Sequence, residues 1–345
     1  MKKGRVIAIE PGPQTMAALI VDGRLEDLLI DPPEGDETPM IEEIHRVRVR
    51  RVIAKQGAAH VKLEGGGKGF LRDAKEAAEG DLLVAQVTGF AEPGKGPPMT
   101  ARRLHRGRYA ILTPHAPGAN VSRALKDPEE RARLAAIAAE RVGDAAPGLI
   151  VRTAAHDVDR EAILEDIDDL LALEASVAAD GPPGKLADAP GAEVTAWREW
   201  GDPDDLIREA GAFDQLGLWD EIEAMKGPRA DLGQGAWMMI EPTSALVAVD
   251  VNTGSDMSND AAAKANLATC RDIFRQLRLR GLGGQITIDF APMRKNDRKA
   301  VESALKKAGA DDPIQTTFAG WTPLGQFEML RKRERRPILE LLPDA

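Results

Sequence analysis

The chain has 345 residues, of which 43% are hydrophobic and 30% charged, and its 46 basic and 56 acidic residues give a formal net charge of −10. This composition is typical of a globular protein with two or three domains, and no apolar stretch approaches the roughly 18 residues of a membrane helix. Cys270 is the one cysteine, which excludes an internal disulfide and a cysteine-based zinc site, so we expect a cytoplasmic protein with no membrane partner.

The negative net charge hides a segregation of acidic and basic residues along the chain. Acids are concentrated in two blocks and bases in four runs, at 22–43 and 156–174 for the acids and at 45–55, 101–108, 271–280 and 330–336 for the bases. One such run is usually a solvated face. Four basic runs against two acidic blocks favour a bipolar molecule, so the net charge does not exclude a nucleic-acid partner.

The first hundred residues read as β-structure. Two apolar segments, 5–9 and 16–31, surround Asp22-Gly23, a hairpin signal. From 46 to about 112, short apolar strands alternate with turns rich in glycine and proline, such as "EGGGKG" and "AEPGKGPP". About five short strands over roughly 65 residues are typical of a small β-barrel such as an OB-fold.

The middle of the chain is mainly helical. Asp127 is a plausible N-cap, and Pro128 suits the first turn of the helix that follows. The expected elements are a helix at 127–142, a buried strand at 148–155, an amphipathic helix at 160–179, a linker at 179–193 and helical segments at 202–213 and 217–227.

The C-terminal third contains a predicted strand–helix–strand unit. Its expected elements are an apolar hairpin at 235–254, a helix at 258–280, a buried strand at 284–293, a helix at 295–309, a strand at 313–320 and a basic tail. Asp250 and Asp289 each follow the last apolar residues of a strand in this unit. If those strands are parallel neighbours, the crossover is right-handed and both carboxylates lie at one edge of the sheet, where α/β proteins place their ligands.

Two carboxylates at one edge predict a cation site. Like charges a few ångströms apart repel unless one is protonated or a cation lies between them. Mg²⁺ takes one or two carboxylates and keeps several waters, so it is the expected ion. Asn252 lies on the same side of the strand as Asp250 and could orient a water or a phosphate. Taken singly, Asp250 could cap a turn and Asp289 could start a loop.

Other candidates are less specific. The helix between the two acids carries Arg271, Arg275, Arg278 and Arg280, which could neutralise phosphates, although two of them could instead only face solvent. Cys270, Trp237, Met238 and Met239 are expected to pack in the core, and the glycines at 281–284 to form a tight turn. The five histidines have no metal-ligand spacing. The run at 330–336 is either a solvated tail or an RNA-contacting strip.

Several segments resemble the ribonuclease E/G family. "AVDVNTGS", Asn266-Leu267, "RQLRLRGLGGQITIDF" and "GQFEM" are similar to its catalytic domain, a deoxyribonuclease-I-like subdomain. The barrel region resembles that family's RNA-binding domain. "GRYAILTPHAPGANVSR" and "GLIVRTA" resemble its sensor for an RNA 5′ monophosphate. The resemblance covers nearly the full chain and is weakest at 179–215.

The resemblance implies an α+β, mixed multidomain fold. An OB-fold-type β-barrel is inserted in a ribonuclease-H-like remnant and is followed by a sensor region and a deoxyribonuclease-I-like α/β catalytic domain. The implied parts are the N-terminal ribonuclease-H-like remnant at 1–43, the barrel at 44–105, the sensor region at 106–178, a linker with the shortened remnant at 179–231 and the catalytic domain at 232–345.

The resemblance also implies a function. The expected activity is that of a Mg²⁺-dependent endoribonuclease in RNA processing or decay, acting on rRNA or mRNA. It cuts single-stranded, AU-rich RNA to 5′-phosphate and 3′-hydroxyl ends. The implied site residues are Asp250 and Asp289 as metal ligands with Asn252 beside them, Phe70, His60 and Lys95 as RNA contacts on the barrel, and Gly107, Ile111, Arg123, Arg152 and Thr153 as the 5′-phosphate sensor.

The sequence departs from the family pattern at several positions. His60 replaces the second barrel aromatic, Pro323 replaces the arginine that completes the sensor pocket, and Pro292 replaces an acid after "IDF". The cysteines that link subunits through zinc do not occur, so we expect no zinc, although a homodimer through the catalytic domain is possible. One alternative is an RNA-binding protein with weak or lost cleavage and 5′-end sensing. A small-molecule phosphoesterase would leave the barrel and the basic runs unexplained.

Overall fold

A computed structural model describes residues 4–92, 94–256, 258 and 260–342. The chain divides into two compact units. The first unit comprises Met1–Asp36 with Pro203–Ala345, and the second unit comprises Glu37–Asp202. Each unit has its own sheets and its own buried core. The chain is therefore a mixed α/β protein in which the first unit is built from both ends of the chain.

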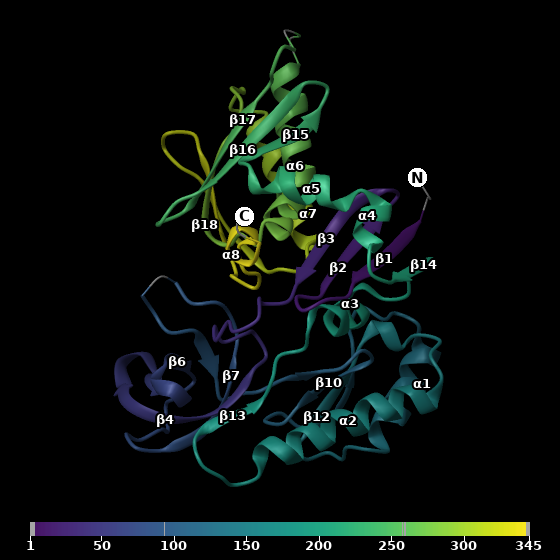
Figure 1. The fold of residues 1–345 in the computed structure, drawn as a ribbon, viewed down its shortest axis with the longest axis vertical. Helices are drawn as coiled ribbons and strands as arrows, with labels where there is room; N and C mark the ends of the chain where they lie inside the picture. The colour runs from purple at the N-terminus through teal and green to yellow at the C-terminus, as the bar shows by residue number, and fades with distance from the viewer. Residues whose placement is uncertain (1–3, 93, 257, 259, 343–345) are drawn as a thin grey trace. The chain divides into compact units, whose positions relative to one another are not determined.

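The first unit begins with a four-stranded sheet in the order β14-β1-β2-β3 (Figure 1). Its strands are β1 (Arg5–Glu10), β2 (Met16–Val21), β3 (Arg24–Ile30) and β14 (Asp205–Arg208). The predicted hairpin is confirmed, because Asp22 and Gly23 have positive φ angles of 49° and 79° between two antiparallel strands.

The segment after residue 202 corrects a prediction. A helix was expected throughout 202–213, but residues 205–208 form β14, which pairs in parallel with β1. The edge of β1 supplies hydrogen-bond partners that outweigh the local helical preference of this segment. Helix α4 (Ala212–Leu216) follows, and α5 (Leu218–Lys226) confirms the helix predicted at 217–227.

A six-stranded sheet forms the rest of the first unit, in the order β15-β16-β17-β18-β20-β19. β17 and β18 are parallel and flank α6 in the sequence, which confirms the strand–helix–strand unit. Of the helix predicted at 258–280, residue 259 lies outside the described residues. The elements are β15 (Arg229–Gly233), β16 (Ala236–Pro242), β17 (Val247–Asn252), α6 (Ala261–Leu279), β18 (Gly284–Asp289), α7 (Arg298–Asp311), β19 (Thr316–Trp321), β20 (Phe327–Arg331) and α8 (Ile338–Leu341).

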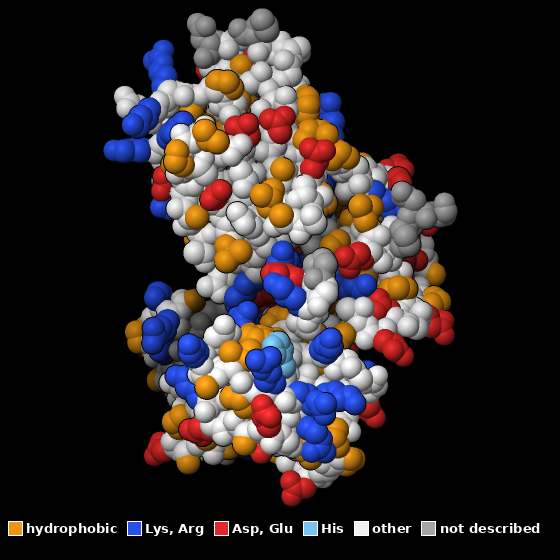
Figure 2. All heavy atoms as spheres, turned by 90° about the vertical axis from the view of Figure 1, so that its left-hand side faces the viewer, with side chains coloured by type: hydrophobic (Ala, Val, Ile, Leu, Met, Phe, Trp, Pro, Cys, Tyr) orange, Lys and Arg blue, Asp and Glu red, His pale blue; other side chains and the backbone are white. Residues whose placement is uncertain are grey.

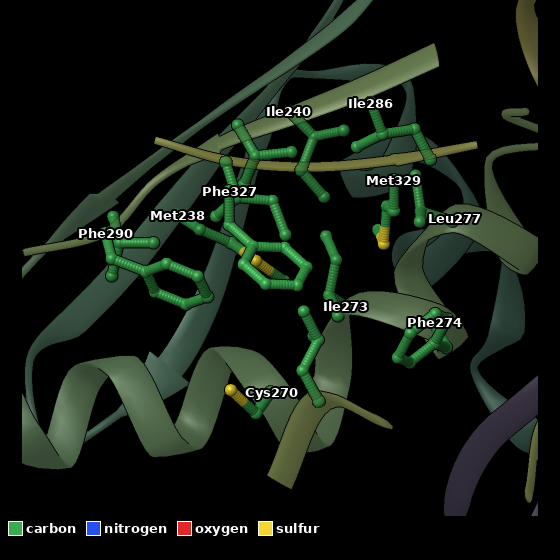
Figure 3. Close-up of a cluster of buried hydrophobic side chains, with 14 of the residues drawn as sticks. Met238, Ile240, Cys270, Ile273, Phe274, Leu277, Ile286, Phe290, Phe327 and Met329 are labelled. Atoms are coloured by element: carbon green, nitrogen blue, oxygen red, sulfur yellow. The ribbon is translucent and has the colours of Figure 1, made fainter. Parts of the chain in front are cut away.

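One face of this sheet packs against α6 and α7. Figure 3 shows Met238, Ile286 and Phe327 from three strands close to Ile273 and Leu277 of α6, and all five belong to one buried cluster. Cys270 is also in this cluster, as predicted, and burial raises the pKa of its thiol to about 12. Because side chains alternate across a strand, the residues between these apolar positions lie on the opposite face, called the open face below.

Arginines of α6 join the two sheets of the first unit, which corrects the expectation that they face phosphates. Arg278 Nη2 donates to the Glu26 carboxylate on β3 at 2.7 Å. Arg275 Nη1 donates to the Leu25 carbonyl at 2.5 Å. Arg280 is 4% exposed, and burial lowers the pKa of its guanidinium to about 10. Three of the four arginines predicted as phosphate contacts are therefore structural.

The basic run at 330–336 is not a solvated tail, although Leu330 and Lys332 are exposed. Its first residues belong to β20, where Arg331 is 1% exposed. Arg336 pairs with Asp36 at 2.5 Å. The glycines of "GLGG" explain how this segment fits: a Cβ at Gly281 would lie 1.8 Å from the Arg336 carbonyl oxygen, and one at Gly283 2.6 Å from that of Lys332. The predicted tight turn is therefore confirmed, and it accommodates the chain that follows β20.

The second unit contains the predicted barrel. Five strands close into a barrel because β4 pairs with both β5 and β7 in a sheet ordered β13-β4-β5-β6-β8-β7, and this is consistent with an OB-type domain. The strands are β4 (Ile44–Ile53), β5 (Ala58–Lys62), β6 (Lys68–Arg72), β7 (Leu82–Val87), β8 (Pro98–Thr100) and β13 (Gly184–Ala187). β13 lies in the stretch expected to be a linker, where pairing with β4 turns a proline-rich segment into an edge strand.

A smaller sheet and three α-helices complete the described part of the second unit. Its order is β11-β12-β10-β9. The Asp127 side chain accepts hydrogen bonds from the Glu129 and Glu130 amides, which confirms the predicted N-cap. The elements are β9 (His105–Arg106), β10 (Ala110–Thr113), β11 (Ala119–Val121), α1 (Pro128–Ala139), β12 (Gly148–Val151), α2 (Arg160–Ala178) and α3 (Ala192–Trp200). Within the described ranges, the longest helices, α2 and α6, have 19 residues each, and neither has the apolar composition of a membrane-crossing helix.

Candidate active site

Asp250 and Asp289 lie side by side at the end of two parallel strands. They are direct Cα partners in the register of β17 and β18, and both side chains are exposed on the open face. Neighbouring strands are about 4.8 Å apart, so the two carboxylates can reach one small ion. The strands therefore present two negative groups to solvent next to each other, with an apolar core directly beneath them.

Asn252 completes this group. It lies two residues after Asp250 on the same face, and its Nδ2 donates to Asp250 Oδ2 at 2.8 Å. This hydrogen bond limits the rotation of the Asp250 side chain and directs the carboxamide towards the acid. Among the described residues, no cluster of three or more acidic, histidine or cysteine side chains is placed to hold a metal. The candidate site is thus two carboxylates and one carboxamide.

Asn266 fixes the backbone that follows Asp289, and the sequence offered no role for it. The Ala291 amide donates to Asn266 Oδ1 at 2.9 Å, and Asn266 Nδ2 donates to the Ala291 carbonyl at 2.9 Å. Asn266 lies on α6 and is 0% exposed. A buried asparagine in the middle of an apolar helix face is the signal that could have indicated this positioning role.

We expect Asn266→Ala to destabilise the first unit by about 2–3 kcal/mol, because two buried backbone groups of Ala291 lose their partners. RNA cleavage should fall as the Asp289 backbone loosens. Urea unfolding followed by tryptophan fluorescence gives the first quantity. Thr269→Val is the matched control: it removes a buried hydroxyl that donates to Ala265 within the same helix, so it should cost under about 1 kcal/mol. Equal losses for both variants would contradict the positioning role.

The open face also carries residues that sequence reasoning assigned elsewhere or missed. Met238 is in the core as predicted, but Trp237 and Met239 are half-buried on the open face, as the Cα partners of Asn252 and Asp250. The apolar run concealed this alternation. Glu328 of β20 lies on the same face opposite Thr287 of β18, in a segment where the sequence predicts a basic tail instead of a strand.

Two of the three candidate RNA contacts on the barrel lie together. His60 and Phe70 are cross-strand partners on β5 and β6, with ring centroids 5.7 Å apart in an edge-to-face arrangement. His60 is exposed and Phe70 half-buried. Lys95 lies in the loop before β8, and the Phe70 amide donates to the carbonyl of Pro97 in that loop at 2.9 Å. The Lys95 side chain is 70% exposed and pairs with Glu92.

Basic side chains surround this aromatic pair. The exposed ones on β4, β5 and β6 are Arg48, Arg50, Arg51, Lys62, Lys68 and Arg72. Arg51 is the cross-strand partner of His60. Figure 2 shows Lys and Arg side chains gathered in several places on the face that it presents. Part of the run at 45–55 is nevertheless buried, because Arg46 is 7% exposed and donates to backbone carbonyls between 177 and 182.

The small sheet gathers the five candidate sensor positions. Ile111 on β10 pairs with Ile150 on β12. Arg123 and Thr153 each come two residues after Val121 and Val151, which are partners in the parallel pair β11 and β12, and both are exposed. The candidate sensor set therefore lies around the end of β12.

Gly107 and Arg152 are in direct contact within this group. Arg152 Nη1 donates to the Gly107 carbonyl at 2.7 Å. A side chain at Gly107 is excluded, because a Cβ would lie 2.3 Å from Asp166 Oδ2. Asp166 accepts hydrogen bonds of 2.9 Å from each of the three backbone amides at 108–110, which holds the turn before β10 rigid.

The Arg152 guanidinium already has an acidic partner. Arg152 Nη2 donates to Glu199 Oε2 at 2.6 Å, and Glu199 lies on α3. Burial alone would raise the pKa of the Glu199 carboxyl, but Arg152 and Arg198 outweigh it and hold this pKa below its usual value. Glu199 is therefore ionised near neutral pH. Sequence reasoning did not identify this pairing, because the two residues are 47 positions apart.

Known proteins resemble this chain over most of its length. A model of the "Ribonuclease E/G family" matches residues 105–191 and 204–334. Proteins named ribonuclease E from Nostoc sp. and Synechocystis sp. are 31% and 30% identical over 306 and 304 residues, which cover 76% and 75% of this chain but 44% and 45% of theirs. Ribonuclease G of Escherichia coli is 27% identical over 396 residues, covering 95% of this chain and 80% of that protein. The chain thus spans less than half the length of the two ribonuclease E relatives.

Proposed function

Because the chain belongs to the ribonuclease E/G family, we propose that it is an endoribonuclease whose reaction centre consists of Asp250, Asn252 and Asp289. The observation that supports this centre is the register of β17 and β18, which makes the two acids direct neighbours on the open face. Neither acid is needed to fill the core, since both side chains are exposed. A family of ribonucleases and a solvent-facing acid pair are best explained together by phosphodiester hydrolysis.

The donor set fits a divalent cation, for which we propose Mg²⁺. Asp250 and Asp289 supply two hard oxygen ligands, and Mg²⁺ takes the rest of its shell from water and phosphate. When bound, such an ion lowers the pKa of a coordinated water and stabilises charge on the phosphate. Asn252 keeps Asp250 oriented and offers its carboxamide to a water or a phosphate oxygen. The proposed products have 5′-phosphate and 3′-hydroxyl ends.

We propose that the substrate is single-stranded, AU-rich RNA bound partly by the barrel. Phe70 and His60 offer ring surfaces for stacking, which is worth roughly 1–3 kcal/mol per base. Lys95 and the exposed barrel arginines and lysines provide phosphate contacts that weaken with salt. The sensor set Gly107, Ile111, Arg123, Arg152 and Thr153 is proposed to lie at the 5′ end of the bound RNA. Pro323 lies in the turn between β19 and β20 and offers no donor to a phosphate.

The remaining parts of the proposal follow the family. The sheet of β1, β2, β3 and β14 is assigned to a ribonuclease-H-like remnant, and the six-stranded sheet to a deoxyribonuclease-I-like catalytic domain. The protein is proposed to act in the cytoplasm in rRNA processing or mRNA decay. It is proposed to assemble, if at all, as a homodimer through the catalytic domain without zinc.

A cleavage assay tests the proposed activity. An internally labelled, 5′-monophosphorylated single-stranded RNA is incubated with the protein in Mg²⁺ and in EDTA. We expect internal cuts in Mg²⁺ and none in EDTA, with products that a 5′-phosphate-dependent ligase accepts. Salt-sensitive binding without any cut would instead support an RNA-binding protein on the same scaffold, an alternative that the departures at His60 and Pro323 favour.

A further inference from the structure

Glu199 is bound to the Arg152 guanidinium, which is the group that a terminal phosphate would bind. Both terminal nitrogens of the Arg152 guanidinium donate hydrogen bonds: Nη1 to the Gly107 carbonyl at 2.7 Å, and Nη2 to Glu199 Oε2 at 2.6 Å. An arginine binds a phosphate best by presenting two parallel N–H groups. With Nη1 on a backbone carbonyl and Nη2 on a carboxylate, each terminal nitrogen of Arg152 already donates to an acceptor of this protein.

The position of Glu199 is enforced by its neighbours. Arg198 Nε donates to Glu199 Oε1 at 2.8 Å, so the carboxylate is shared between two guanidinium groups. Arg198 is itself 8% exposed and makes a bidentate pair with Glu42, with both distances 2.8 Å. Glu199 is therefore not a mobile surface acid that a ligand displaces at little cost. Its side chain is 32% exposed, so it still faces solvent beside Arg152.

The same end of α3 has a further anchor. Arg108 Nη1 donates to the Trp197 carbonyl at 2.8 Å, and its guanidinium lies 3.8 Å from the centroid of the Trp197 ring. Arg108 Nη2 also pairs with Asp202 at 2.6 Å, just after the helix. Arg108, Arg152 and Arg198 together hold the last turn of α3 against the small sheet. The backbone that carries Glu199 is therefore fixed beside Arg152.

A 5′ phosphate would meet an unfavourable field here. A phosphomonoester carries about −1.5 to −2 charges near neutral pH. Beside Arg152 it would meet the negative carboxylate of Glu199, and like charges in a partly buried setting repel each other. A 5′ hydroxyl carries no charge and meets no such repulsion. The electrostatics therefore remove the advantage that a lone Arg152 would give to a phosphorylated end.

We propose that Glu199 is a specificity-determining residue that masks Arg152 and makes RNA binding and cleavage insensitive to the state of the 5′ end. This inference rests on the proposed function of the sensor set, because it assigns Arg152 to the 5′ end of an RNA.

Binding measurements test the proposal without relying on cleavage. Two single-stranded RNAs of one sequence, labelled at the 3′ end and bearing either a 5′ phosphate or a 5′ hydroxyl, are titrated in EDTA at one fixed salt concentration. The wild-type protein should bind both with affinities within about twofold. Glu199→Gln should favour the phosphorylated RNA by about tenfold, the effect of one charge-assisted hydrogen bond. Adding Arg152→Ala to Glu199→Gln should abolish that gain.

The matched control is Glu165→Gln, which removes the same charge from an exposed position on α2 of the same unit. It should leave the ratio of the two affinities unchanged. A wild-type protein that already prefers the phosphorylated RNA by tenfold would overturn the proposal, whatever the folding of the variants. So would a gain that survives Arg152→Ala. If the affinities behave as expected but no RNA is cut in Mg²⁺, this inference stands while the proposed endoribonuclease activity fails.

Discussion

Replacing Asp250 or Asp289 with asparagine is expected to reduce RNA cleavage by about 10³-fold or more, while RNA binding changes little. Each substitution keeps the size of the side chain and removes one of the two charges that the parallel strands place next to each other. Because both residues are exposed on the open face, folding should be preserved. The double variant should be no slower than the slower single variant, since the two acids act as one unit.

Single-turnover cleavage of a labelled RNA measures this loss, and its binding in EDTA serves as the second readout. Asp231→Asn is the matched control, because Asp231 is an exposed acid on β15 of the same sheet and its charge is shared with Arg229 at 3.0 Å. It should retain cleavage within about twofold of wild type. A loss of less than about tenfold in both site variants would show that the chemistry lies elsewhere in the molecule.

The second large effect concerns stability. Replacing Asp312 with alanine is expected to lower the free energy of unfolding of the first unit by about 3–5 kcal/mol, because it leaves buried positive charges without their partner. Asp312 Oδ1 accepts from Arg331 Nη1 at 2.8 Å, and Asp312 Oδ2 contacts Arg278. The side chains of Asp312 and Arg331 are 1% and 0% exposed, so water cannot replace the lost carboxylate without rearrangement.

Urea unfolding followed by tryptophan fluorescence and circular dichroism gives the change in free energy. Asp311→Ala is the control, since Asp311 is the exposed acid next to Asp312 at the end of α7, and its loss should cost about 0.5 kcal/mol at most. Adding Arg331→Met to Asp312→Ala should recover much of the stability, because a buried ion pair can often be exchanged for apolar packing. A cost below about 1 kcal/mol for Asp312→Ala would show that Arg331 finds another partner.

The elements around the candidate site could be predicted from local patterns. The apolar patterns of β17 and β18, with α6 between them in the sequence, predicted a strand–helix–strand unit with Asp250 and Asp289 near the ends of its strands, and the structure shows that these strands are parallel. The short strands and glycine-rich turns between 46 and 112 likewise predicted a barrel. These features depend on the repeat of apolar side chains within one helix or strand, and that repeat can be seen in consecutive residues of the sequence.

Long-range pairings could not be read in this way. Residues 205–208 have a helical pattern but form a strand, because the edge of β1 is available to them in the folded chain. The sequence shows how many arginines α6 and the run at 330–336 carry, but it does not show what they bind. Arg278 and Arg331 both pair with the buried Asp312. A basic run in a sequence carries no information about which acid it will meet.

The sequence by itself determined the strand–helix–strand unit, the barrel, the acid pair and the family resemblance. Only the tertiary structure decided that Asn266 holds Ala291 and that Glu199 holds Arg152. The physical reason is that periodicity and turn chemistry act between near neighbours in the chain. Hydrogen bonds and ion pairs between distant residues depend on the packing that brings those residues within about 3 Å of each other.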